Sequence, residues 1–125
     1  MGGIVALAGA LPPAFLVGLG GALGALARYA VDVALGGGRR STFAVNVLGS
    51  VALGAIVASA PSDATLALAG TGFCGAFTTF STFAFETVRL FETGERRRAL
   101  ANAAVNLAGA LAAVWVGSAL AAAVW

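Results

Sequence analysis

The chain has 125 residues, of which 60% are hydrophobic and 10% are charged, and its mean hydropathy is +0.98. This composition excludes an ordinary soluble domain, in which about a quarter of the residues are charged, and predicts an integral membrane protein. The net charge of +2 is too small and too dispersed for a nucleic-acid-binding surface. One cysteine, Cys74, and no histidine exclude a disulfide framework and a Cys/His metal site. We expect Cys74 to pack as a small buried residue.

Four apolar segments fill nearly the whole chain, and each is long enough to cross a hydrocarbon core about 30 Å thick. Pro12 and Pro13 favour a helix start before the first segment. The stretch ahead of them has no positive charge before its apolar run, which argues against a cleaved signal sequence. The sequence therefore predicts an all-α membrane protein with a single four-helix domain over residues 1–125. The spans are expected at residues 13–35, 42–60, 64–91 and 99–124.

The connections between the predicted spans are short and strongly biased in charge. Residues 36–40 read GGGRR, residues 61–63 read PSD, and residues 92–98 read ETGERRR. PSD predicts a turn followed by a helix cap. The first and third connections lie on one side of the membrane, and all seven arginines lie on or toward that side. By the positive-inside rule, both termini should be external.

Small residues recur at intervals of four along the predicted spans. Such spacing allows helix backbones to approach closely in lipid, although glycine and alanine are common in membrane helices in any case. Four short helices enclose too little volume for an aqueous path of their own, so a transport path should lie between subunits. The small residues are Gly20 and Gly24, Ser50 and Gly54, and Gly109, Ala113 and Gly117.

Polar side chains within the spans are the first functional candidates, because unpaired polar atoms are costly in hydrocarbon. Asn46, Asn102 and Asn106 could donate hydrogen bonds to an anion, or could simply join helices. Glu86 and Arg89 have the spacing of an i, i+3 ion pair. That pair could be structural, shared with Arg28 or Asp32, or it could guide ions in a vestibule.

The third span contains the stretch GFCGAFTTFSTFAFE at residues 72–86, which is unusually polar for a membrane helix. Backbone that departs from helix at membrane depth is tolerated only where protein buries it or a cavity adjoins it. Gly75 would permit unusual dihedral angles, and the hydroxyls of Thr78 and Thr79 could satisfy freed carbonyls. A break here would offer carbonyl oxygens to a cation and amide ends to an anion.

Three phenylalanines, Phe77, Phe80 and Phe83, repeat every three residues through this stretch. Their ring edges carry the positive end of the aromatic quadrupole and could face a small anion. Ordinary packing between helices is the alternative for such a stripe.

With these residues in place, the chain resembles the Fluc (CrcB) family of bacterial fluoride channels from about residue 18 to residue 117. The segments that carry the resemblance are GGALGALARY, STFAVNVLGS, GFCGAFTTFSTFAFE and NLAGALAAVWVG. The motif TTFSTF is the specific part. The resemblance implies a multi-pass protein of the bacterial plasma membrane, a dimer of two antiparallel subunits, and two fluoride paths at their interface.

The resemblance also implies roles for individual residues. Backbone carbonyls of Gly75 and Thr78 would hold a structural Na⁺ at the dimer centre. Arg28, Glu86 and Asn102 would be polar vestibule or structural positions. In the fourth span the family usually offers aromatic or hydroxyl side chains, whereas this chain has Asn102, Asn106 and Ala110. The resemblance places Asn46, Phe80, Thr82 and Phe83 along the ion path, and we expect Ser81 and Asn106 to line it as well.

Several alternatives remain open for the assembly and for the function. A homodimer of opposed subunits needs a chain that inserts both ways, so the arginine bias favours pairing with a related chain of inverse bias. A small multidrug-resistance-type antiporter would need a carboxylate near the middle of the first span, where only Asp32 stands, close to the end. A non-transporting assembly subunit is the other alternative. No nucleophile has an evident base, so an enzyme is not expected.

Overall fold

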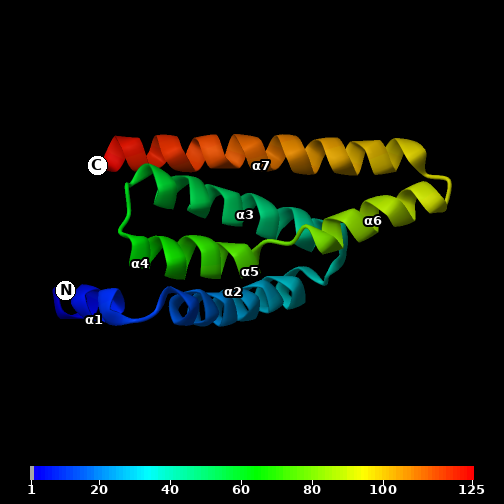
Figure 1. The fold of residues 1–125 in the computed structure, drawn as a ribbon. Helices are drawn as coiled ribbons and strands as arrows, with labels where there is room; N and C mark the ends of the chain where they lie inside the picture. The colour runs from blue at the N-terminus through cyan, green and yellow to red at the C-terminus, as the bar shows by residue number, and fades with distance from the viewer. Residues whose placement is uncertain (1) are drawn as a thin grey trace.

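The structure is a computed structural model that describes residues 2–125, and these residues form helices joined by short turns (Figure 1). Within the described residues there is no strand. The third span consists of four consecutive segments, one of them the π-helix η1. In chain order the elements are α1 (Gly2–Ala10), α2 (Pro13–Leu35), α3 (Gly38–Ala58), α4 (Asp63–Thr65), η1 (Leu66–Cys74), α5 (Gly75–Phe77), α6 (Ser81–Glu92) and α7 (Arg96–Val124).

Four helical stretches are long and apolar enough to cross a membrane, which confirms the predicted four-helix membrane class. They cover Pro13–Leu35, Gly38–Ala58, Asp63–Glu92 and Arg96–Val124. The second and fourth helical stretches begin at Gly38 and Arg96, before the starts predicted at residues 42 and 99. Hydropathy locates the part of a helix inside hydrocarbon, whereas the hydrogen-bonded helix continues into the interfacial zone. The short helix α1 was not predicted.

Local signals in the sequence explain where the helices begin and end. Pro13 is the first residue of α2, where its missing N–H costs nothing. Gly36 ends that helix with φ 75°, a left-handed conformation that glycine adopts without strain. The Ser62 side chain accepts a hydrogen bond from the Thr65 N–H at 3.2 Å, which confirms the predicted cap.

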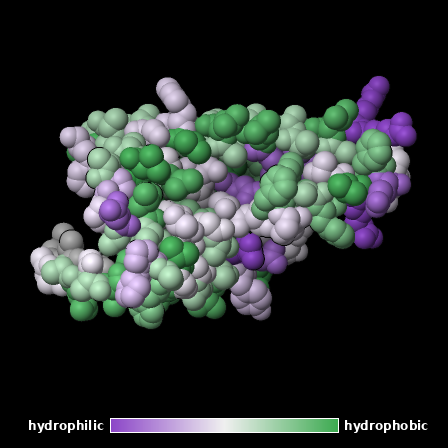
Figure 2. Space-filling view, in the orientation of Figure 1, coloured by the Kyte–Doolittle hydropathy of each residue, from purple (hydrophilic) through white to green (hydrophobic). Residues whose placement is uncertain are grey.

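The helices pack in two close pairs, α7 alongside α3 and α2 alongside η1, and the two termini lie at the same end of the molecule (Figure 1). The α6–α7 turn lies at the opposite end. Figure 2 shows a largely apolar surface, as expected of a protein surrounded by lipid, with a dense group of hydrophilic residues at that turn and smaller hydrophilic patches elsewhere on the face shown.

Small residues make both close approaches possible. A Cβ on Gly20 or Gly24 would collide with the η1 backbone at Leu68 or Phe73. On the other pair, a Cβ on Gly54 would meet the Val114 carbonyl of α7. Gly117 is packed in the same way against the α3 backbone, and Ala113 is 4% exposed. The predicted small-residue interfaces are therefore confirmed for these positions.

Candidate functional site

The third span is interrupted between α5 and α6, at residues 78–80. Thr78 has extended backbone angles, φ −82° and ψ 164°, and a new helix starts at Ser81. The predicted break is therefore present, but its predicted hinge is wrong. Gly75 has ordinary helical angles, φ −61° and ψ −38°, so the departure from helix begins three residues later.

Asn46 on α3 determines where the helix opens. Its Oδ1 accepts a hydrogen bond from the Thr79 N–H at 2.8 Å, and its Nδ2 donates to the Thr79 carbonyl at 3.0 Å. Thr79 is 9% exposed, so these groups have little access to water. One side-chain amide thus satisfies both the N–H and the carbonyl of Thr79 at the break.

The residues beside the break are secured by further hydrogen bonds. The Thr78 hydroxyl donates to the Cys74 carbonyl at 2.8 Å, but that carbonyl already accepts from the Thr78 N–H at 3.0 Å, so the hydroxyl does not satisfy a freed carbonyl as predicted. Arg28 on α2 donates from Nη1 to the Thr78 carbonyl at 3.2 Å. Cys74 is 3% exposed, in agreement with the expectation of a small packed residue.

The start of α6 carries a cluster of three hydroxyls. The Thr79 hydroxyl donates to Thr82 Oγ1 at 3.0 Å and accepts from the Thr82 N–H at 3.2 Å, so it caps this helix. The Ser81 hydroxyl lies 3.4 Å from Thr79 Oγ1. Ser81 and Thr82 are therefore grouped at the break together with Thr79, whose hydroxyl bonds to Thr82 rather than to a freed carbonyl as predicted.

A cavity of about 670 Å³ opens beside the break. It brings together six of the predicted site residues, from α3, α5, the break, α6 and α7. Its walls are otherwise mainly small and apolar, and Phe80 is 79% exposed on it. The six predicted residues on its lining are Asn46, Gly75, Thr78, Phe80, Phe83 and Asn106.

The phenylalanine stripe divides at the break. Phe77 is 8% exposed and stacks on Phe73 with ring centroids 5.7 Å apart, so ordinary packing accounts for it. Phe80 and Phe83 form a tilted pair with centroids 5.9 Å apart and an interplanar angle of 57°. Both line the cavity, where their ring edges can meet a ligand.

The two asparagines of α7 lie on one face, as their spacing predicted, but they mainly bond to protein. Asn102 Nδ2 donates to the Thr87 hydroxyl at 2.9 Å and so joins α7 to α6. Asn106 Nδ2 donates to the Asn102 carbonyl at 2.8 Å and lies 3.3 Å from Asn102 Oδ1. Asn106 Oδ1 is buried without a hydrogen-bond partner among the described residues. The atom of Asn106 left free is therefore an acceptor.

The predicted pairing of Glu86 with Arg89 is wrong. Glu86 Oε1 accepts a hydrogen bond from the Thr42 hydroxyl at 2.9 Å, and its buried Oε2 has no partner in residues 2–125. Asp32 accepts from Ser41 at 2.7 Å rather than joining an ion pair. Each of these two carboxylates thus accepts a hydrogen bond from a neutral hydroxyl, and neither is paired with an arginine within the described residues.

Three of the other predicted residues lie on two further cavities, whereas Ser81 and Asn102 line none of these three cavities. Arg28 and Thr82 line a second cavity of about 300 Å³ together with Thr42 and Thr79. Glu86 lines a third, at the arginine end. Thr79 belongs to both the first and the second cavity, so the break forms the wall between them. Thr42 was missed; its only signal in the sequence was a hydroxyl next to the second span.

Comparison with known proteins places the chain in one family. A family model described as CrcB-like protein, Camphor Resistance (CrcB), matches residues 15–118. A relative from Natronomonas pharaonis, named Fluoride-specific ion channel FluC 2, is 51% identical over 91% of this chain and 98% of its own length. Relatives with names of the same kind from Haloarcula marismortui and Methanocaldococcus jannaschii are 50% and 41% identical, over 84% and 88% of the chain and 90% and 94% of their own lengths. The chain belongs to the CrcB family.

Proposed function

We propose that the chain is a subunit of a fluoride-selective channel that passively exports cytoplasmic fluoride and so relieves fluoride toxicity. The relatives named fluoride-specific ion channels match it over most of its length, and its four apolar helices fit a multi-pass protein of the plasma membrane. The observation that carries the proposal is the interrupted third helix, braced by Asn46 and opening onto a cavity with Phe80 and Phe83. The chain is a channel subunit and not an enzyme.

The chemistry at the break suits a small, strongly hydrated anion. Asn46 has two amide hydrogens, and the Thr79 carbonyl takes one, so the other can donate to fluoride. The exposed edges of Phe80 and the half-buried Phe83 add partial positive charge without a fixed cation that would trap the ion. Ser81 and Thr82 add hydroxyl donors beside the break.

Asn106 is not expected to donate a hydrogen bond directly to the anion, which is the role that its sequence position suggested. Its amide hydrogens point to Asn102, and its free Oδ1 would repel a bare anion. We expect Oδ1 to accept a hydrogen bond from a water molecule, whose second hydrogen would point toward the path, because buried acceptors without a protein partner are usually satisfied by water. Asn102 acts by fixing α7 to α6 through Thr87.

A second, antiparallel subunit would complete two such paths. Phe80 is 79% exposed within the isolated subunit, and the cavity beside it is open on the outer face of the four helices. A partner packed on this face would bury Phe80 and turn the open cavity into enclosed passages. The arginine bias supports a partner of inverse bias, because the arginines lie on or toward one side of the membrane and the 61–63 turn on the other side has none.

A structural Na⁺ at the dimer centre fits the carbonyls at the break. The Thr79 N–H bonds to Asn46 Oδ1, so the Gly75 carbonyl loses the donor that a continuous helix would supply. Gly75 is exposed on the cavity, and the Thr78 carbonyl keeps a second lone pair beside its bond from Arg28. The ion would supply positive potential near the anion path.

Fluoride efflux from vesicles, followed with a fluoride electrode, tests the function. We expect passive efflux that excludes chloride and does not depend on a proton gradient, in vesicles that hold the chain with its partner. Proton-coupled movement of organic cations would instead indicate an antiporter. Absence of fluoride efflux, both alone and with a paralogue, would identify an assembly subunit.

A further inference from the structure

A crevice of about 570 Å³ lies at the arginine end of the molecule, outside the cavity at the break. The start of α3 forms one wall, with Arg39 and Arg40, and the end of α6 forms another, with Arg89. Glu86 and Glu95 also line it. Three arginines from two helices therefore surround one hollow that is large enough for several hydrated ions.

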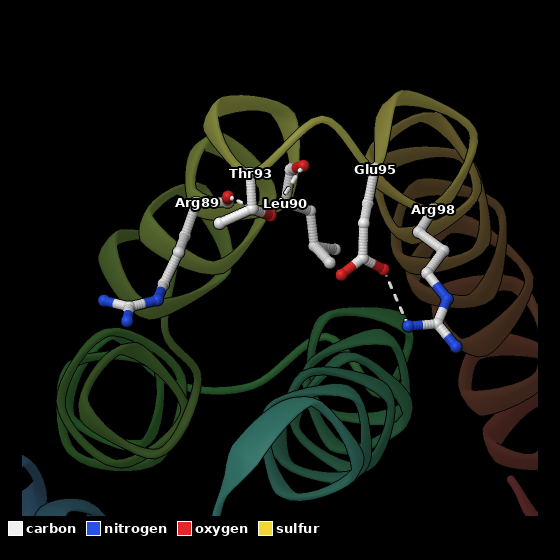
Figure 3. Close-up of polar contacts among 5 residues, drawn as sticks. All are labelled: Arg89, Leu90, Thr93, Glu95 and Arg98. Carbon is white, nitrogen blue, oxygen red and sulfur yellow. Dashed lines mark hydrogen bonds and ion pairs between the residues drawn. The ribbon is translucent and has the colours of Figure 1, made fainter.

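The charge of these three arginines is not neutralised by ion pairs. Within residues 2–125 the one ion pair joins Arg98 Nη1 to Glu95 Oε2 at 2.7 Å. Figure 3 shows Arg98 reaching Glu95 from α7, whereas Arg89 extends away from that carboxylate. Because Arg98 neutralises Glu95, the lining keeps its three arginine charges against the single carboxylate of Glu86.

The position of this charge is costly for the fold. Arg39 and Arg40 stand in the first turn of α3, where the helix macrodipole is already positive and basic side chains are unfavourable. Arginines at this end also set membrane orientation, but Arg96 and Arg97 at the start of α7 serve that purpose equally. What distinguishes the lining arginines is that they share one crevice.

The crevice adjoins the polar interior of the subunit. Glu86 on its lining accepts a hydrogen bond from Thr42 at 2.9 Å, and Thr42 lines the inner cavity of about 300 Å³ with Thr79 and Thr82. The Thr42–Glu86 hydrogen bond thus links the lining of the arginine crevice to the lining of the inner cavity. An anion collected in the crevice would be held next to the proposed path.

We propose that the arginine crevice is an antechamber that concentrates fluoride before it enters the path, an inference that rests on the proposed function. Clefts lined by charge of one sign raise the local concentration of the opposite ion and its rate of entry. Glu86 prevents the anion from binding too firmly, because its unpartnered Oε2 is an acceptor that repels fluoride.

Two adjacent pairs of arginines provide a matched test. Arg39→Gln/Arg40→Gln removes two charges from the crevice, and Arg96→Gln/Arg97→Gln removes two from the first turn of α7 outside it. We expect the crevice pair to lower fluoride efflux about threefold to tenfold at low fluoride and about 10 mM salt, where the Debye length is about 30 Å. The deficit should shrink at high salt and at saturating fluoride, and the control pair should stay within about twofold of wild type.

The Glu95–Arg98 pair provides a second test that leaves the lining arginines in place. Arg98→Gln would free the Glu95 carboxylate to neutralise the crevice, so efflux at low fluoride should fall. Adding Glu95→Gln should restore it, because the released negative charge is then removed. A purely structural role of the ion pair would give no restoration.

The outcomes separate this inference from the function on which it rests. A silent wild-type complex would overturn both. A conducting wild type with equal efflux in the two arginine pairs would overturn the antechamber alone. If the crevice pair differed from wild type only in vesicles with phosphatidylglycerol, and not in pure phosphatidylcholine, the arginines would hold lipid phosphate and the inference would be wrong.

Discussion

Asn46 shows how one side chain can open a membrane helix. It contacts Thr79, 33 residues away, through both Oδ1, which accepts, and Nδ2, which donates. A buried polar group left without a partner costs about 1–3 kcal/mol, and lipid offers no water to replace it. The break is therefore stable because α3 supplies the partner, and the same amide keeps a donor for the proposed ion path.

Phe80 is the residue whose function can be separated most clearly from folding. Phe80→Ile should lower fluoride efflux about tenfold or more, because an aliphatic group lacks the aromatic edge charge worth about 1–2 kcal/mol to an adjacent ion. Stability of the isolated subunit should change little, since Phe80 is 79% exposed within it.

Phe85→Ile is the matched control, because Phe85 is 63% exposed on α6 but does not line the cavity. Efflux is measured with a fluoride electrode at equal reconstituted amounts. Equal efflux from the two variants would remove Phe80 from the path.

The α3–α7 pair depends on glycines that let the two backbones meet. Gly54→Ala should lower the free energy of unfolding by about 1–3 kcal/mol, since the new Cβ would collide with the Val114 carbonyl and force the helices apart. Labelling of Cys74, which is 3% exposed, with a thiol-reactive dye during heating measures the change.

Gly18→Ala in α2 is the control, because a Cβ there meets nothing within 4 Å. Alanine is favoured over glycine in a helix by about 1 kcal/mol, so this variant should be neutral or more stable. Loss of stability in both variants would mean that helix contacts do not explain the Gly54 effect.

The elements also show how far the sequence predicts the structure. Hydropathy and turn residues located the four spans, because burial in lipid depends on composition over a long window. The break was predicted within the right stretch but assigned to Gly75, because the deciding contact comes from Asn46 on another helix. The π-helix η1 had no local signal; it lies where Gly20 and Gly24 admit its backbone.

The same distinction applies to the site residues. TTFSTF predicted where polar and aromatic groups gather, and they do line or flank the cavity at the break. The spacing of Glu86 and Arg89 predicted an ion pair that does not form, since spacing cannot report a competing hydroxyl on α3. Nor could it show that the Asn106 amide turns toward Asn102.

For the molecule as a whole, charge asymmetry decides which partner is possible. The seven arginines lie on or toward one side of the membrane, so the chain should insert predominantly in one orientation. An antiparallel complex then requires a second chain of opposite bias. Expressed alone, the chain should give little fluoride efflux and one accessible face to protease, and co-expression with such a paralogue should restore efflux.

Reversing the bias tests the same point. Moving arginines from the 92–98 turn to the 61–63 turn should make a mixture of orientations and allow the chain to conduct by itself. Efflux from the unmodified chain alone, with termini found on both sides, would show that it forms its own antiparallel dimer.

The most direct test of the account is fluoride efflux from vesicles that hold the complex with either wild-type chain or Asn46→Asp. The substitution replaces the free amide donor by a carboxylate that repels fluoride. One side-chain oxygen can still accept from the Thr79 N–H, but the donor to the Thr79 carbonyl is lost, so the free energy of unfolding should also fall by about 1–3 kcal/mol. We predict selective efflux from wild type and a loss of about a hundredfold in the variant, because one lost charge-assisted donor together with repulsion is worth about 3 kcal/mol. Thermal unfolding should show that both chains are folded. Equal fluoride efflux from the two would contradict a path along the interrupted third helix.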